Sequence, residues 1–191
     1  MKKAAFMTAV VAVTMLVLAL LPGCGGDTGK ARDYTQKGDK IILGMQTETY
    51  KLNKTLQRIL TDLSSGKITV SAQAKQMEND LEKASADPVE KAKSARAEFE
   101  KVLGLQDVGS YKEYATLRIE AIDNVIKIID ESKVFLAYSA GFLETAEKGQ
   151  AVNQQEWQDK AQTFFSSINE LGQKVNESGQ KADKLKKEKN L

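Results

Sequence analysis

Apolar residues recur at steps of three and four along almost the whole chain after residue 32, which is the spacing of one helix face. The first such segment runs from about Arg32 to Leu63 and ends at the turn-forming Ser64-Ser65-Gly66. Its spacing is that of a heptad repeat, which lets helices pack side by side at a small crossing angle. The pattern predicts one long helix here. Its inward positions are Ile42, Met45, Thr49, Leu52, Leu56, Ile59 and Leu63.

A second helical segment is predicted from about Val70 to Leu103, with an interruption in the middle. Asp87-Pro88-Val89-Glu90 has the form of a helix start, with an aspartate cap and proline at the first helical position. Two interpretations follow: a kink within one helix, or a reversal of the chain. The kink is favoured because an unbroken segment of about 34 residues matches the length of its neighbours.

The remainder of the chain predicts two more helices. Ser110-Tyr111-Lys112-Glu113 has the pattern of a capping box and opens a segment that runs to about Lys148. A similar pattern at Asn153-Gln154-Gln155-Glu156 opens a fourth segment that keeps heptad spacing almost to the end. Four such segments with short loops predict an all-α domain over residues 32–191. The expected fold is an up-down-up-down antiparallel four-helix bundle with its second helix kinked near Pro88.

The chain before residue 32 has a different organisation. An apolar run of about 18 residues, from Ala4 to Leu21, follows Lys2 and Lys3, which is the pattern of a secretory signal peptide. It ends in Leu21-Pro22-Gly23-Cys24, and this is the only cysteine in the chain. The alternative is an uncleaved transmembrane anchor in which the cysteine is incidental.

Leu21-Pro22-Gly23-Cys24 resembles the lipobox of bacterial lipoproteins. The resemblance implies that residues 1–23 are a signal peptide cut between Gly23 and Cys24, and that Cys24 carries a diacylglyceryl group. Two acyl chains give stable membrane attachment, whereas one is marginal. The glycine-rich residues 24–31 are then expected to form a lipidated flexible tether. The expected location is the extracytoplasmic face of a bacterial membrane, either the cell membrane or, with two membranes, the outer one.

The composition lacks residue types that common catalytic and metal-binding sites use. The chain has no histidine and one cysteine, so the commonest general base and the commonest zinc ligands are missing. We therefore expect no enzyme activity, no metal and no cofactor. Removing Lys2 and Lys3 from the 28 basic residues leaves 26, equal to the 26 acidic residues. A neutral mature chain lacks the basic stripe of a nucleic-acid-binding protein.

Six aromatic side chains lie near the predicted turn between the third and fourth helices, at the end away from the membrane. They favour either a hydrophobic pocket or partner surface, or a core in which large rings fill space. They are Phe135, Tyr138, Phe142, Trp157, Phe164 and Phe165.

Lysines are frequent in the last segment, which returns to the side where the tether begins. They predict either contact with anionic headgroups or a solvated helix end whose charge suits the helix dipole. The candidates for membrane contact are Lys181, Lys184, Lys186, Lys187 and Lys189.

Together these patterns predict a membrane-anchored lipoprotein of the cell envelope that acts as a non-catalytic protein-binding or scaffolding module. The expected partners are membrane lipid, through the acylated cysteine, and an envelope protein. The alternative is a small-molecule sensor or solute-binding lipoprotein that uses the aromatic end. A sealed core at that end would favour the first, and a cavity with a few polar groups the second.

Overall fold

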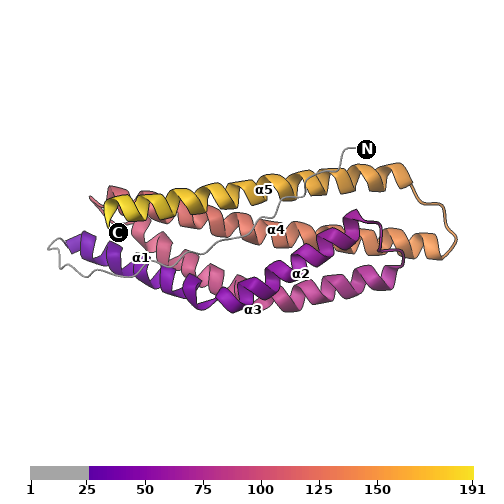
Figure 1. Ribbon diagram of the computed structural model, residues 1–191, viewed down its shortest axis with the longest axis horizontal. Coiled ribbons are helices and arrows are strands. Elements are labelled where there is room, and N and C mark those ends of the chain that lie inside the picture. Colours follow the sequence, from indigo (N-terminus) through magenta and orange to yellow (C-terminus); the bar gives the residue numbers. More distant parts are fainter. Residues whose placement is uncertain (1–25) are drawn as a thin grey trace.

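The computed structural model describes residues 26–191, and this part of the chain is all-helical, as predicted (Figure 1). Its five helices are joined by short loops, and no strand occurs among these residues. The predicted signal peptide, the Gly23–Cys24 cleavage site and Cys24 itself lie outside the described residues. The helices are α1 (Gly26–Gly44), α2 (Gln46–Ser64), α3 (Ser71–Leu103), α4 (Gly109–Glu147) and α5 (Gln154–Lys189).

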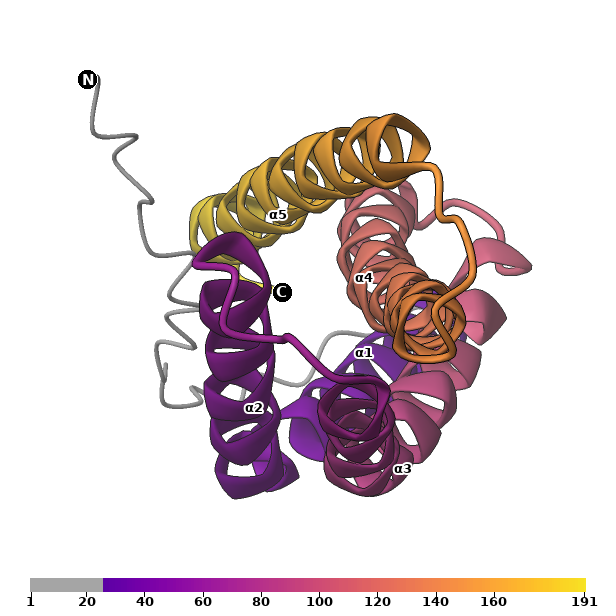
Figure 2. The same ribbon diagram turned by 90° about the vertical axis from the view of Figure 1, so that its right-hand side faces the viewer.

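The helices surround a common long axis, as the end-on view in Figure 2 shows. Helix α4 packs between α3 and α5, while α1 and α2 lie against α3. Helices α2 and α5 are neighbours around this axis, yet no Cα atom of α2 comes within 8 Å of one in α5. The helix packing is therefore uneven, and α2 has fewer close neighbours than α3 or α4.

The first predicted helix is divided in two at Met45, which corrects the expectation of one segment over residues 32–63. Gly44 ends α1, and glycine is among the weakest helix formers. The N–H of Met45 donates to Ile42 O at 3.2 Å. The acceptor is three residues back, as in a 3₁₀ turn, and not four residues back, as in an α-helix. Helix α2 leaves the line of α1 at this point (Figure 1).

Helix α1 also begins earlier than the predicted start at Arg32. Residues from Gly26 onward are helical, although residues 24–31 were expected to form a flexible tether. The burial of one residue and one hydrogen bond explain why this segment is helical. Ala31 is fully buried, and the Asp27 carboxylate accepts a 2.9 Å hydrogen bond from the Gln106 N–H in the α3–α4 loop.

Helix α3 continues through Pro88 without interruption, so the alternative of a chain reversal there is wrong. Pro88 is buried inside the helix. Proline has no N–H, so one intrahelical hydrogen bond is missing at this position.

Several helix ends follow the predicted turn chemistry. Gly66 and Gly149 have φ of 66° and 69°, in the left-handed region that favours glycine. The Asn153 side chain accepts from the Glu156 N–H at 3.1 Å and caps α5. The predicted capping box at Ser110 is wrong, because α4 begins at Gly109 with Val108 as its N-cap residue and has no side-chain cap.

The core consists of two clusters, one towards each end of the molecule. We call the end where α1 begins and α5 ends the proximal end, and the opposite end the distal end (Figure 1). The proximal cluster combines buried residues of α1, α3, α4 and α5, including Ala31, Phe99, Tyr114 and Leu185. The distal cluster combines α2, α3, α4 and α5, and includes Leu56, Leu81, Leu136, Phe135 and Phe164.

Candidate functional site

The six predicted aromatic residues form one contiguous group at the distal end. Phe135 of α4 lies at its centre and stacks on Phe164 of α5, with ring centroids 4.4 Å apart and an interplanar angle of 11°. The ring centroid of Trp157 lies 6.2 Å from that of Phe135 and 5.9 Å from that of Phe142. Tyr138 and Phe165 complete the group at 6.5 and 6.4 Å from Phe135.

Burial divides this group into two parts. Phe135 and Phe164 are only 5% and 6% exposed, so they belong to the core and hold α4 against α5. The other four rings are half-buried and lie at the margin of the core. Their placement matches the core interpretation for the central pair, whereas the outer rings border solvent or a cavity.

A cavity of about 170 Å³ lies beside the outer rings. It is formed by the end of α2 and the α2–α3 loop on one side, and by the end of α4 and the start of α5 on the other. Its apolar walls are Leu63, Ile68, Phe142, Leu143 and Trp157, and the remaining lining residues are Gly66, Ser139 and Gln154. The cavity therefore occupies the region where the α2 and α5 backbones stand apart.

Two residues that line this cavity carry buried polar atoms without a hydrogen-bond partner among residues 26–191. They are the hydroxyl of Ser139, a residue 1% exposed, and the indole N–H of Trp157. An unpaired buried donor or acceptor costs about 1–3 kcal/mol, so such groups are rare in native proteins. Both atoms have almost no accessible surface, so neither is exposed to the space inside the cavity.

Sequence reasoning identified Trp157 and Phe142 but missed Ser139. The available signal was the spacing of two serines, Ser132 and Ser139, seven residues apart on the inward face of α4. The two hydroxyls differ, because Ser132 donates to Ile128 O at 2.7 Å whereas Ser139 has no partner in the described chain.

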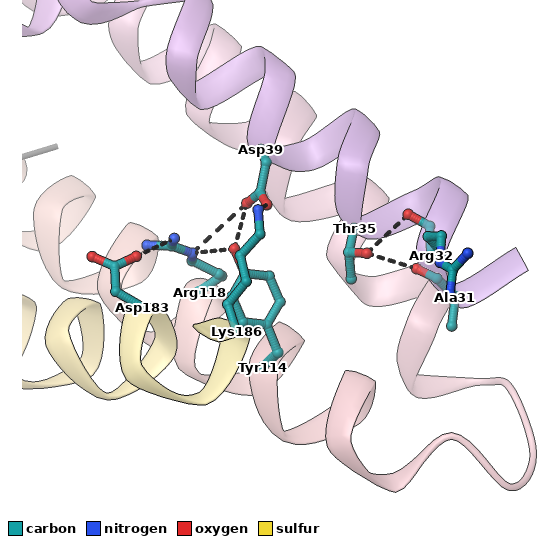
Figure 3. A network of polar contacts seen from close by, with 8 residues as sticks. All are labelled: Ala31, Arg32, Thr35, Asp39, Tyr114, Arg118, Asp183 and Lys186. Carbon is teal, nitrogen blue, oxygen red and sulfur yellow. Dashed lines mark hydrogen bonds and ion pairs between the residues drawn. The ribbon is translucent and has the colours of Figure 1, made fainter. Parts of the chain in front are cut away.

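A network of polar side chains joins three helices at the proximal end (Figure 3). The Asp39 carboxylate of α1 accepts a 2.6 Å hydrogen bond from the Tyr114 hydroxyl of α4 and an ion-paired one from the Lys186 ammonium of α5. Arg118 Nε donates to the Tyr114 oxygen at 2.9 Å, and its Nη2 donates to Asp183 at 2.7 Å. One carboxylate of α1 thus accepts donors from both α4 and α5.

Burial sets the chemistry of this network. Tyr114 is fully buried, and this burial raises the pKa of its hydroxyl well above the usual 10. The neighbouring Arg118 charge lowers that pKa and Asp39 raises it further. Tyr114 therefore stays neutral and acts as a hydrogen-bond donor. The side chains of Asp39 and Arg118 are each 19% exposed, so water screens their attraction only in part.

No protein-family model, curated protein or solved structure matches the chain. The two ends of the bundle are therefore interpreted from their own geometry. Across residues 26–191 no group of three or more His, Cys, Asp or Glu side chains could hold a metal ion. Within the same range, no helix is long and apolar enough to cross a membrane.

The five candidate lysines are not equivalent. Lys186 lies 5.8 Å from the centre of the Tyr114 ring and is paired with Asp39, so it belongs to the network. Membrane contact by these lysines stays a prediction. The other four, Lys181, Lys184, Lys187 and Lys189, are exposed on the last turns of α5.

Proposed function

We propose that this protein is a bacterial lipoprotein, anchored through acylated Cys24 at the extracytoplasmic face, that acts as a non-catalytic helical module binding a protein partner of the envelope. The observation that carries the proposal is the position of the chain ends. Helix α1 begins two residues after Cys24, at the same end of the molecule where α5 terminates. The opposite end is then the one presented away from the membrane (Figure 1).

The connection between Cys24 and α1 is short. Two residues span about 7 Å at most, so a lipidated Cys24 holds the proximal end against the headgroups. Helix α4, with 39 residues, is about 58 Å long. Four exposed lysines near the anchor supply positive charge, each worth about 1 kcal/mol at most beside anionic lipid. The module then acts as a spacer that carries its distal end outward.

The finer architecture is part of this proposal. We infer that α1 and α2 together form the first of four antiparallel helical segments, and that α3, α4 and α5 form the other three. The fold is then an up-down-up-down bundle in which α3 is kinked at Pro88. Two facts support this: α1 and α2 are separated only by Met45, and Pro88 removes a backbone donor in mid-helix.

Substitution of the lipidation site tests the anchor. Cys24→Ser removes the only thiol, and we expect it to abolish incorporation of labelled palmitate. Wild-type protein from membranes whose mass still includes residues 1–23, with no acyl group, would instead support the uncleaved transmembrane anchor. A circular dichroism spectrum equal to that of the wild type serves as the control for folding.

Crosslinking from intact cells tests the partner. A photoreactive residue at the exposed distal Gln150 is expected to give one defined protein adduct, whereas the same residue at exposed Asn176, along the side of α5, gives none. Equal adducts from both positions would show that the distal end has no special role.

A second candidate function, small-molecule binding at the distal end, is favoured by one specific observation. The cavity beside the aromatic group is lined mostly by apolar side chains, with Ser139 and Gln154 as its polar residues. This is the combination of features expected of a binding pocket, although its volume of about 170 Å³ limits the occupant to one small ring.

A further inference from the structure

The proximal end carries an exposed leucine beside the proposed anchor. Five large apolar side chains are exposed among residues 26–191, and Leu103, the last residue of α3, is the one at this end. Its side chain is 40% exposed. A single exposed leucine is common on protein surfaces, so its position in the molecule decides what it means.

Contacts hold the loop between α3 and α4 against the start of α1. The Gln106 N–H donates to the Asp27 carboxylate at 2.9 Å. Val108, at the end of the loop, is only 4% exposed and belongs to the proximal cluster together with Ala31. The α3–α4 loop, residues 104–108, is therefore fixed beside the first turns of α1.

The chain between this contact and the proposed lipid site is short. Asp27 follows Cys24 by three residues, which span about 10 Å at most. With Cys24 acylated, the carboxylate that holds the α3–α4 loop stays close to the lipid headgroups. Leu103, which directly precedes this loop, is then held next to the bilayer surface, where an exposed apolar side chain gains by leaving water.

The charges at this end suit a membrane with anionic lipids. Glu188 pairs with Lys184 at 3.8 Å, whereas three other exposed lysines on the last turns of α5 have no ion pair within residues 26–191. The exposed Asp107 of the α3–α4 loop offsets one of these charges. Lysines next to anionic headgroups add to membrane attachment. The three are Lys181, Lys187 and Lys189.

We propose that the proximal end makes a second membrane contact, in which Leu103 inserts at the boundary between headgroups and acyl chains while the lysines of α5 rest on anionic headgroups. The inference rests on the lipid anchor of the proposed function, and it specifies the surface that faces the bilayer. An acyl anchor alone leaves the module free to tilt. A second contact restricts that tilt and directs the distal end outward.

Quenching of tryptophan fluorescence by brominated lipid tests the insertion. Trp157 is the only tryptophan in the chain and lies at the distal end, so Trp157→Phe removes the native signal. Acylated Leu103→Trp protein in this background is placed in vesicles of phosphatidylglycerol and brominated phosphatidylcholine. We expect its emission to fall by about half relative to unbrominated vesicles, because an inserted interfacial side chain lies about 5–10 Å deep, beside the acyl chains.

Val134→Trp in the same background is the matched control. Val134 is 70% exposed and follows Gly109, the first residue of α4, by 25 positions, which is about 37 Å along the helix. Its emission should not change with bromination, and neither should that of Trp157 in the wild-type protein. Circular dichroism spectra equal to that of the wild type check that both variants fold.

A photoreactive lipid tests the native leucine without a substitution. Acylated wild-type protein is irradiated in vesicles that contain phosphatidylglycerol with a diazirine near the glycerol. Mass spectrometry of the peptides should place lipid adducts on residues 103–108 and on the last turns of α5, and none around Val134.

Three results would count against the insertion. A Leu103→Trp variant that floats with the vesicles but is not quenched would overturn it and leave the acyl anchor intact. Equal quenching of the Leu103→Trp and Val134→Trp variants would also overturn it, because the module would then lie along the bilayer. Wild-type protein without an acyl group on Cys24 would contradict the anchor and the insertion together, and palmitate labelling detects that case independently.

Discussion

The strongest prediction concerns Asp39, the carboxylate that joins α1 to α4 and α5. Asp39→Ala removes the acceptor of the Tyr114 hydroxyl and the partner of Lys186. The fully buried Tyr114 then keeps its bond from Arg118 but has no acceptor for its own proton. Arg118 stays paired with Asp183, so its charge is not left wholly uncompensated.

The magnitude follows from these contacts. A hydrogen bond to a charged group contributes about 1.5–3 kcal/mol, and breaking a buried ion pair costs about 3–5 kcal/mol. Because the Asp39 side chain is 19% exposed and that of Lys186 is 30% exposed, the lower part of this range applies. We expect a loss of about 3 kcal/mol in the free energy of unfolding. For a domain of this size the corresponding fall in Tm is about 6–12 °C.

Urea unfolding followed by circular dichroism measures this loss, with Asp33→Ala as the control. Asp33 is also on α1, but it is 57% exposed and pairs only with Lys37 one turn away, so its loss should cost less than about 0.5 kcal/mol. In a double-mutant cycle, Asp39→Ala and Tyr114→Phe should couple by about 1 kcal/mol or more. A cost below about 1 kcal/mol for Asp39→Ala, with additive behaviour in the cycle, would refute the reasoning.

Two further predictions concern packing and pH. Gly38→Ala places a Cβ 2.6 Å from the ring of buried Phe99, so we expect it to destabilise by about 1–3 kcal/mol in urea titrations, whereas Gly29→Ala, with open space around it, should stabilise by up to about 1 kcal/mol. Hydrogen bonds from Lys148 and Lys75 lower the pKa of Glu144 from its ordinary 4.5 to about 2. The resulting stability is fully present above pH 4.5 and is lost as the pH falls towards 2, so thermal unfolding of Glu144→Gln should depend less on pH across that interval.

The helical content and most loops could be predicted from the sequence, because apolar spacing and turn residues act locally. Gly66 and Asn153 end and begin helices where their chemistry requires it. The break at Met45 was missed since the apolar stripe continues across it, and a stripe records which face is buried but not whether the axis bends. Gly44 was the local signal.

The two ends of the bundle differed in how far they could be predicted. The aromatic group was found because its members lie on two helix ends joined by a short loop, so sequence proximity implies spatial proximity. The bond between Asp39 and Lys186 spans 147 residues, and in a chain with 54 charged residues no one-dimensional pattern selects that pair. Ser139 was missed because it occupies an inward position of the helical repeat, and the spacing alone does not distinguish it from the apolar residues at the other inward positions.

The chemistry of the two ends leads us to expect a difference in rigidity between α1 and α2. Charged hydrogen bonds are directional and short, so Asp39 fixes α1 against α4 and α5 in one geometry. Helix α2 is held to α4 and α5 by apolar side chains, whose contacts tolerate small shifts. The two helices meet at Met45, where the hydrogen-bond ladder is already altered. We therefore expect α2 to shift more readily than α1, so that the proximal end keeps its geometry when the distal end changes shape.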